Sequence, residues 1–431
     1  MNQVTFPQLE ETLYTEVLDN GLTVFLLPKE GFHKMYATFT TKYGSVDHRF
    51  VPIGDSSPVQ LPDGIAHFLE HKMFEDEDGD IFQQFSKQGA SANAFTSFTR
   101  TAYLFSSTSN KEINTTTLLD FVQYPYFTDE TVEKEKGIIE QEIRMYEDNP
   151  DWQNFFGLLS AMYENHPVHI DIAGTAESIA EITKEHLYTA YRTFYHPANM
   201  TLFLVGSFDP EEMIELIRSN QKQKSFVPPE EPVRFQEDEP EAVRSARLEK
   251  EMPVQVGKCL VGIKEKRAGR EGQEMLKREL ALQTALEMLF GRSSEGYSDL
   301  FTKGLIDDSF SFDYTAENTF GFSVIGGDSE KPHILEEEIL SKISSAVKDG
   351  FDKESFERIR RKKIGFFLRA LNSPEYIANQ FTRYHFNNMH LFDVIPVMEE
   401  LTLEEVESIF RDHMDLETQA AGCLIFPEGE M

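Results

Sequence analysis

The chain has 431 residues, which is too many for one hydrophobic core, so we expect two or more domains. Hydrophobic residues make up 40 % of the sequence, which favours well-packed cores over disorder. The formal net charge of −33 predicts a surface that repels nucleic acid and anionic membranes, so neither is expected as a partner. We favour solubility as the reason for this charge; attraction of basic peptides is the alternative.

No segment predicts a signal peptide or a membrane span. The first residues lack a charged head followed by an apolar run, and no stretch approaches the roughly 20 apolar residues that cross a bilayer. The two cysteines, Cys259 and Cys423, lie in apolar runs and are expected to be small core residues of a reducing compartment. Together these features predict a cytoplasmic protein.

The first half begins with expected strands and then a short helix. Alternating apolar residues flank Asn20-Gly21, a dipeptide typical of tight hairpin turns, so 13–27 should form two antiparallel strands. Another strand is expected at 36–41. After a loop, residues 64–75 predict a helix, and the carboxylate of Asp63 could cap its first turn.

This helix carries a possible metal site. His67, Glu70 and His71 stand at positions i, i+3 and i+4, so their side chains project from one face. Two imidazoles one turn apart can bind one zinc ion, and a neighbouring carboxylate can take a proton from water bound to it. The pattern is His-x-x-Glu-His, the inverted zincin motif. By itself it is equally consistent with a buried helix that has two structural histidines, so a third ligand must decide.

A candidate third ligand lies on a later helix. The elements expected after the zinc helix are a helix at 81–88, strands at 90–97 and 101–107, and helices at 115–124, 130–147 and 152–164. On the second of the last three helices, Glu135 and Glu142 lie two turns apart on one face. Ile138, Ile139 and Met145 lie close to that face, so we expect it to point inward. Buried acidic side chains need a partner, and a zinc ion would be one.

The rest of the chain predicts a linker and a second, similar domain. A helix at 184–193, a strand at 201–205 and a helix at 210–219 end the first half, and 223–248 is a proline-rich, charged linker. The second half repeats the order of elements. It begins with a strand at 255–264, a helix at 274–290, a loop and short helix at 291–303, and strands at 308–314 and 319–326. It ends with helices at 334–349, 353–371, 374–389 and 403–413, and a strand at 419–426. At the position of the zinc helix the second half has residues 285–290, which contain no histidine, so we expect no metal there. The predicted fold class is α+β, with domains at 1–222 and 249–431.

The combination of motifs resembles the M16 metallopeptidases, the family of pitrilysin, insulin-degrading enzyme and the mitochondrial processing peptidase. The resemblance rests on His-x-x-Glu-His at 67–71, on Glu142 preceded by Glu135, and on Asn93-Ala94-Phe95-Thr96. Residues 19–22 and 195–200 also match. The resemblance covers nearly the whole chain and is closest to the short bacterial form of the family.

The resemblance implies a fold, a cofactor and roles for the residues. His67, His71 and Glu142 would bind Zn2+, Glu70 would be the general base, and Glu135 would support the site from outside the ligand set. The fold would be two α/β-sandwich domains of the LuxS/M16 metalloenzyme type, each with an antiparallel-rich sheet, arranged as a clamshell. In short members two chains pair to enclose a chamber.

The expected activity is that of a zinc-dependent endopeptidase acting on extended oligopeptides. A peptide could add as an extra strand along 91–97, which makes Asn93, Ala94 and Phe95 the expected substrate-binding residues. An ordinary edge strand is an alternative of equal weight.

One departure from the family pattern concerns the second domain. Active members often carry an Arg and, seven residues later, a Tyr that grip the substrate, whereas Leu300 and Asp307 stand at these positions here. Arg292 and Tyr297 are near but wrongly spaced. We therefore expect the catalytic half of a heterodimer with a paralogous M16 subunit, with a homodimer as a further possibility. The alternative function is a non-catalytic assembly or regulatory subunit.

Overall fold

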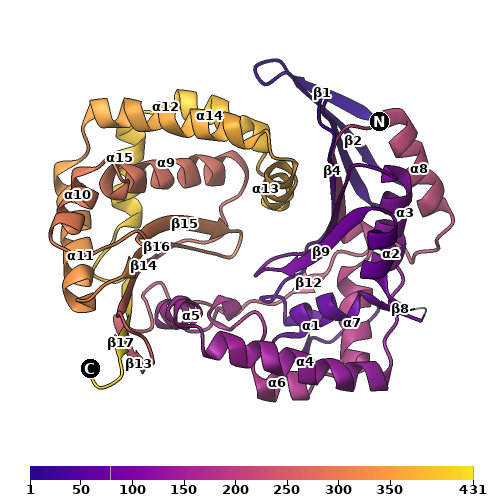
Figure 1. The fold of residues 1–431 in the computed structure, drawn as a ribbon, viewed down its shortest axis with the longest axis horizontal. Coiled ribbons are helices and arrows are strands. Elements are labelled where there is room, and N and C mark those ends of the chain that lie inside the picture. Colours follow the sequence, from indigo (N-terminus) through magenta and orange to yellow (C-terminus); the bar gives the residue numbers. More distant parts are fainter. Residues whose placement is uncertain (78, 431) are drawn as a thin grey trace. The chain divides into compact units, whose positions relative to one another are not determined.

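A computed structural model describes residues 1–77 and 79–430 (Figure 1). Asp78 and Met431, which fall within the two predicted domains, lie outside the described residues. Contacts divide the chain into two compact units. Unit 1 comprises Met1–Ile143, Asp171–Gln236 and Ala370–Phe386, and unit 2 comprises Arg144–Ile170, Glu237–Arg369 and Asn387–Met431.

Unit 1 is built on a seven-stranded mixed sheet with the order β1-β2-β3-β11-β4-β10-β9. Its strands are β1 (Asn2–Phe6), β2 (Glu11–Val17), β3 (Thr23–Pro28), β4 (Met35–Thr41), β9 (Ala90–Thr96), β10 (Thr101–Ser107) and β11 (Met200–Gly206). Strands β3 and β11 are parallel, and the other neighbours are antiparallel. Among the described strands, β9 pairs with β10 alone, so one edge of β9 is open.

Helices cover both faces of the central strands of this sheet, which explains why every residue of β4 and β11 is buried. The helices of unit 1 are α1 (Ile65–Lys72), α2 (Ile81–Lys87), α3 (Lys111–Val122), α6 (Ala176–Ala180), α7 (Lys184–Phe194), α8 (Pro210–Lys222) and α13 (Pro374–Phe386), together with most of α4 (Asp129–Glu147). Two short sheets complete the unit, one of β5 (Arg49–Val51), β6 (Val59–Gln60) and β12 (Val233–Arg234), the other of β7 (Glu75–Asp76) and β8 (Gly79–Asp80).

Unit 2 has a five-stranded sheet with the order β13-β17-β14-β16-β15. Its strands are β13 (Arg247–Met252), β14 (Lys258–Lys264), β15 (Ser311–Glu317), β16 (Phe320–Asp328) and β17 (Ala420–Pro427). They repeat the order and directions of β3, β11, β4, β10 and β9, including the parallel first pair. The helices are α5 (Pro150–Met162), α9 (Gly272–Phe290), α10 (Glu295–Thr302), α11 (Pro332–Asp349), α12 (Lys353–Ala370), α14 (Val394–Glu400) and α15 (Leu403–His413).

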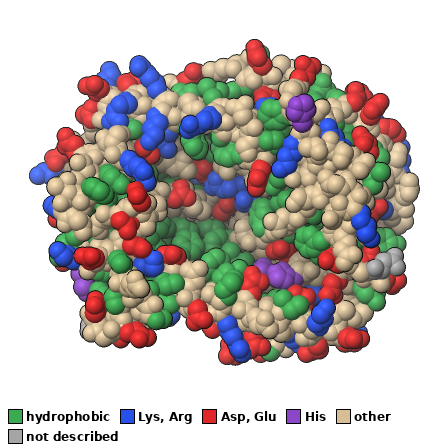
Figure 2. Space-filling model, in the orientation of Figure 1, with side chains coloured by type: hydrophobic (Ala, Val, Ile, Leu, Met, Phe, Trp, Pro, Cys, Tyr) green, Lys and Arg blue, Asp and Glu red, His purple; other side chains and the backbone are tan. Residues whose placement is uncertain are grey.

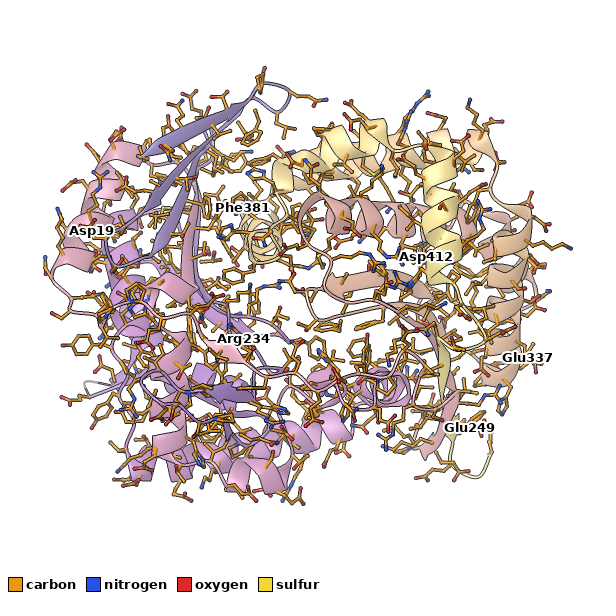
Figure 3. The ribbon with its side chains drawn as sticks, turned by 180° about the vertical axis from the view of Figure 1, so that it is seen from behind. Asp19, Arg234, Glu249, Glu337, Phe381 and Asp412 are labelled. Atoms are coloured by element: carbon orange, nitrogen blue, oxygen red, sulfur yellow. The ribbon has the colours of Figure 1, made fainter. Side chains whose placement is uncertain are left out.

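The two halves of the sequence exchange one helix each. Helix α5 comes from the first half but packs on β14 and β17 of unit 2, whereas α13 comes from the second half and packs on β4 and β11 of unit 1. Phe381 of α13 has its ring centroid 4.8 Å from that of Phe25 and 4.5 Å from that of Phe203 (Figure 3). Burying one such ring stabilises the fold by about 1.5–3 kcal/mol. The units are therefore not contiguous in sequence, and the domain boundaries 1–222 and 249–431 stay a prediction.

The predicted α+β fold class is confirmed, because each unit combines an open mixed sheet with helices. The repeated order of elements is also present, as the matching sheets show. The predicted linker 223–248 contains the two residues of β12, and Arg234 Nε donates to Asp47 Oδ1 at 2.8 Å (Figure 3). This segment is thus tied to unit 1 at that point.

Candidate metal centre

Helix α1 presents the His-x-x-Glu-His residues and is held by its own apolar side chains. Ile65, Phe68 and Leu69 are fully or almost fully buried. The helix begins after Gly64, whose φ of 86° is left-handed, and a Cβ there would lie 2.4 Å from the carbonyl oxygen of Ala173, so only glycine fits.

The predicted cap of this helix is wrong. The side chain of Asp63 makes no hydrogen bond to the first turn; its Oδ1 lies 3.0 Å from His48 Nδ1 instead. The left-handed residue at the cap position is Gly64, so Asp63 is one residue too early to reach the free amide hydrogens.

Helix α4 brings the acidic residues to the same place. Its buried stripe consists of Val132, Glu135, Ile139 and Ile143. The prediction that the face of Glu135 and Glu142 points inward is correct for Glu135, which is buried, whereas Ile138 and Met145 are 45 % and 58 % exposed and lie outside the buried stripe. At about 100° per residue, the stripe is centred close to Ile139, and Ile138 lies about 100° away from that centre. Glu142 lies at the border of this stripe and is partly exposed.

Three predicted ligands converge. Among residues 1–77 and 79–430, His67, His71 and Glu142 form the one group of at least three His, Cys, Asp or Glu residues placed to hold a metal ion, with donor atoms within 4.8 Å of one another. His67 Nε2 lies 3.8 Å from Glu142 Oε1, and His71 Nε2 lies 3.6 Å from Glu142 Oε2.

These distances fit a tetrahedral zinc site. Ligands at about 2.0–2.2 Å from zinc stand about 3.3–3.6 Å apart, so small side-chain movements suffice to close the site. Two imidazole nitrogens and one carboxylate oxygen are also a donor set of catalytic zinc, which keeps a fourth position open.

Glu135 contacts the His71 ring at Nδ1, while the other ring nitrogen faces Glu142. Oε1 of Glu135 lies 3.0 Å from His71 Nδ1, and the side chain is almost completely buried. An ionised carboxylate can only accept, so Nδ1 is the donor and Nε2 keeps a lone pair for a metal. Burial alone would lower the pKa of His71, but the hydrogen bond from Glu135 and the charges of Glu70, Glu135 and Glu142 raise it above its ordinary value.

His67 is in a different environment. Burial, followed by the neighbouring His71, lowers the pKa of His67 to about 4. The ring is therefore neutral near neutral pH, which is the form that binds a metal. Its Nδ1 is buried and has no hydrogen-bond partner among the described residues.

Glu70 lies beside the three ligands and is connected to the edge strand. Its Oε2 accepts a hydrogen bond of 2.7 Å from Thr96 Oγ1, at the end of β9. Glu70 is 8 % exposed, and this burial raises its pKa, while the Thr96 hydroxyl acts in the opposite direction. Thr96 was part of the motif read from the sequence but was not predicted to touch the site, because the signal for that contact is the packing of β9 on α1.

The predicted substrate-binding residues lie on the open-edged strand. Asn93, Ala94 and Phe95 are the residues of β9 just before Thr96, and none of the three is buried. They pair with Leu104, Tyr103 and Ala102 of β10 on the other edge. These three residues directly precede Thr96, whose hydroxyl contacts Glu70.

The positions at which the family pattern has its substrate-binding Arg and Tyr lie in unit 2. Leu300 is completely buried, and Asp307 Oδ1 accepts hydrogen bonds from the backbone and hydroxyl of Ser309 at 2.8 and 2.6 Å. Arg292 pairs with Asp308 at 3.3 Å, and Tyr297 stacks on a neighbouring ring of α10. Neither Leu300 nor Asp307 can donate a side-chain hydrogen bond to a peptide.

No helix among the described residues has the length and apolar character needed to cross a membrane. The two cysteines are buried and free, as expected for small core residues.

Two family models match the chain. Residues 52–176 match the model described as Insulinase (Peptidase family M16), and residues 181–363 match the model described as Peptidase M16 inactive domain. The uncharacterized zinc protease YmfH of Bacillus subtilis (strain 168) is 57 % identical over 425 residues, which cover 99 % of both chains.

Solved structures agree with this result. An M16-like peptidase from Alicyclobacillus acidocaldarius shares 42 % identity and a TM-score of 0.93, with 98 % of this chain and 99 % of that chain covered. A protease from Helicobacter pylori has a TM-score of 0.82 at 20 % identity over 96 % of this chain and 99 % of that chain, and this match supports the fold alone.

Proposed function

Because this chain belongs to peptidase family M16, we propose that it is a zinc-dependent endopeptidase that hydrolyses extended oligopeptides. The resemblance seen in the sequence is confirmed at the level of the family. The observation that carries the proposal is the convergence of His67, His71 and Glu142 beside the buried carboxylate of Glu70. The similar YmfH is named a zinc protease, which supports the choice of metal.

Each residue of the site would have a distinct role in peptide hydrolysis. His67, His71 and Glu142 would hold zinc, which when bound supplies a Lewis acid for the peptide carbonyl and makes water more acidic. Glu135 keeps the His71 ring in the orientation and tautomer needed for binding. Glu70 accepts the proton of the attacking water and passes it to the leaving amine. Its raised pKa brings the carboxylate closer to the range in which a base works near neutral pH.

The substrate would bind along β9. An extended peptide adds to an open strand edge through main-chain hydrogen bonds, which tolerate many sequences. Asn93, Ala94 and Phe95 would supply this edge, and Thr96 connects its end to Glu70. An ordinary edge strand remains the alternative for these three residues.

The chain would work with a second subunit. The side chains at the expected gripping positions, Leu300 and Asp307, are buried or engaged with Ser309, so we propose that a paralogous M16 subunit supplies the Arg and Tyr in a heterodimer. A homodimer would need Arg292 and Tyr297 to take this role. The rival function, a non-catalytic assembly or regulatory subunit, would not need the complete set of ligands and base that this chain has. A cytoplasmic location stays a prediction.

The test is hydrolysis of a quenched peptide library by the purified chain, alone and mixed with a co-purifying paralogue, with and without chelator. We expect cleavage by the mixture that chelator removes and that Glu70→Gln lowers by about 10²–10⁴-fold, since the amide cannot accept the proton. The variant should keep its zinc, which elemental analysis measures. Cleavage that survives both changes would refute the proposal, and full activity of the chain alone would refute the heterodimer.

A further inference from the structure

Helix α12 carries a row of positive side chains on its exposed side. Arg358, Arg361, Lys362 and Arg369 are all exposed, and their spacing of three to four residues places them on one side of the helix. Gly365 lies in the same row, with open space where a side chain would be. In Figure 2, Lys and Arg side chains gather over the part of unit 2 that Figure 1 labels α12. From Arg358 to Arg369 the row is about 16 Å long, at about 1.5 Å per residue.

Two of these four side chains, Arg358 and Arg361, form no ion pair among the described residues. Lys362 pairs with Glu287, whereas Arg358 donates to the hydroxyls of Ser293 and Ser355 at 2.7 and 3.3 Å. Arg361 has neither an ion pair nor a hydrogen bond among the described residues. Such a row stands out on a protein with a net charge of −33.

Two large apolar side chains flank the row, one on each side. Phe366 and Leu368 are 57 % and 44 % exposed at the C-terminal end of α12. The guanidinium of Arg369 lies over the Phe366 ring, 5.6 Å from its centroid. Cations beside exposed apolar groups are typical of a surface that binds a partner, because both kinds of group gain from being covered.

We propose that this basic stripe, defined as Arg358, Arg361, Lys362, Phe366, Leu368 and Arg369, binds a short acidic segment of a partner protein. Guanidinium groups match carboxylates in geometry as well as charge. A length of about 16 Å corresponds to about five residues of an extended peptide at about 3.3 Å per residue. Phe366 would cover an apolar residue at one end of that segment. This function is independent of peptide hydrolysis.

Other partners fit the charges less well. Two copies of this chain that met through their stripes across a two-fold axis would oppose like charges. A long nucleic acid or an anionic membrane would also meet the surrounding surface of a molecule with a net charge of −33. A short acidic segment can lie on the stripe alone.

The test is fluorescence anisotropy of a short labelled Glu-rich peptide that ends in two Leu residues, titrated with the full chain. The variant Arg358→Glu/Arg361→Glu/Arg369→Glu removes the stripe. Its control, Lys87→Glu/Lys222→Glu/Lys348→Glu, changes the net charge equally at other exposed sites. We expect the stripe variant to bind about tenfold or more weakly, and the control to bind as the wild type does. The affinity of the wild type should fall as salt is raised.

Equal binding by the two triple variants, or no binding by the wild type at low salt, would overturn the proposal. Tighter binding of a single-stranded RNA or of phosphatidylserine vesicles than of the peptide would overturn the choice of partner. If the charge-reversed stripe variant does not fold, Arg361→Gln/Arg369→Gln replaces it, and binding as strong as that of the wild type then has the same meaning. Phe366→Ser should weaken binding of the peptide but not of a peptide without the Leu residues.

Discussion

Replacing Thr96 with Val should show how much the hydrogen bond that positions Glu70 contributes to catalysis. The hydroxyl of Thr96 donates to Oε2 of a carboxylate that is 8 % exposed, at 2.7 Å. Val has nearly the same shape and also suits a strand, so the change removes the hydrogen bond and leaves the backbone of β9 in place. A hydrogen bond to a charged group contributes about 1.5–3 kcal/mol. If that energy is needed to orient the base, the loss corresponds to about 10–100-fold in kcat/KM.

The pH profile gives a second readout with a defined sign. The hydrogen bond from Thr96 lowers the pKa of Glu70, in opposition to the larger effect of burial, which raises it. Without the hydroxyl the pKa should rise further. The acidic limb of kcat/KM, along which Glu70 loses its proton, should therefore move to higher pH in Thr96→Val.

The assay is hydrolysis of a quenched peptide across pH by the wild type, Thr96→Val and Thr96→Ser, each with the same partner subunit and with zinc content measured. Thr96→Ser keeps the hydroxyl and should retain most of the activity. The reasoning is refuted if Thr96→Val has the activity and pH profile of the wild type. If Thr96→Ser, which keeps the hydroxyl, is as impaired as Thr96→Val, the hydrogen bond does not explain the loss of activity in Thr96→Val.

Three further predictions concern the metal and the stability of unit 2. Glu135→Ala should weaken zinc binding by about 10–100-fold, and Glu142→Ala should weaken it more; titration with a competing chelator measures both, and the reverse order would exchange their roles. In unit 2 the buried Arg278 donates from Nε and Nη2 to the two carboxylate oxygens of Glu265 at 2.9 and 2.7 Å. Glu265→Leu should destabilise unit 2 by about 3 kcal/mol in urea unfolding, since it leaves Arg278 buried with Asp412 as its remaining ion-pair partner; a change under about 1 kcal/mol would contradict this. Burial would raise the pKa of Glu265, but His413 and Arg278 hold it well below its ordinary value. The resulting stabilisation is complete above the unfolded pKa of about 4.3 and is lost as the pH falls below it, and Glu265→Gln should remove this dependence.

The sequence predicts well what depends on one helix or on a known motif. His67, Glu70 and His71 share a face because of their spacing alone, and the structure places them together as that spacing requires. The repeat of element order could likewise be read along the chain, because periodicity and turns are local signals.

Features that depend on packing could not be predicted. The width of the buried stripe of α4 is one example: Ile138 and Met145 lie close to the predicted inward face, but they point about a quarter-turn or more away from the centre of the stripe and are exposed. The bond between Thr96 and Glu70 joins a strand to a helix that lies earlier in the chain. The left-handed conformation of Gly64, which displaces the cap, depends on the close approach of Ala173.

The exchange of α5 and α13 has a consequence for synthesis on the ribosome. The sheet of unit 1 is complete once Gly206 has been made, but the helix that covers β4 and β11 ends only at Phe386. At about 5–20 residues per second, the wait between Gln236 and Phe386 is roughly eight to thirty seconds. During that time one apolar face of these strands is without its helix, so we expect the nascent chain to expose a surface that chaperones bind. Cutting the gene within 223–248 would make this exposure permanent, because each fragment would lack a helix that the other one carries.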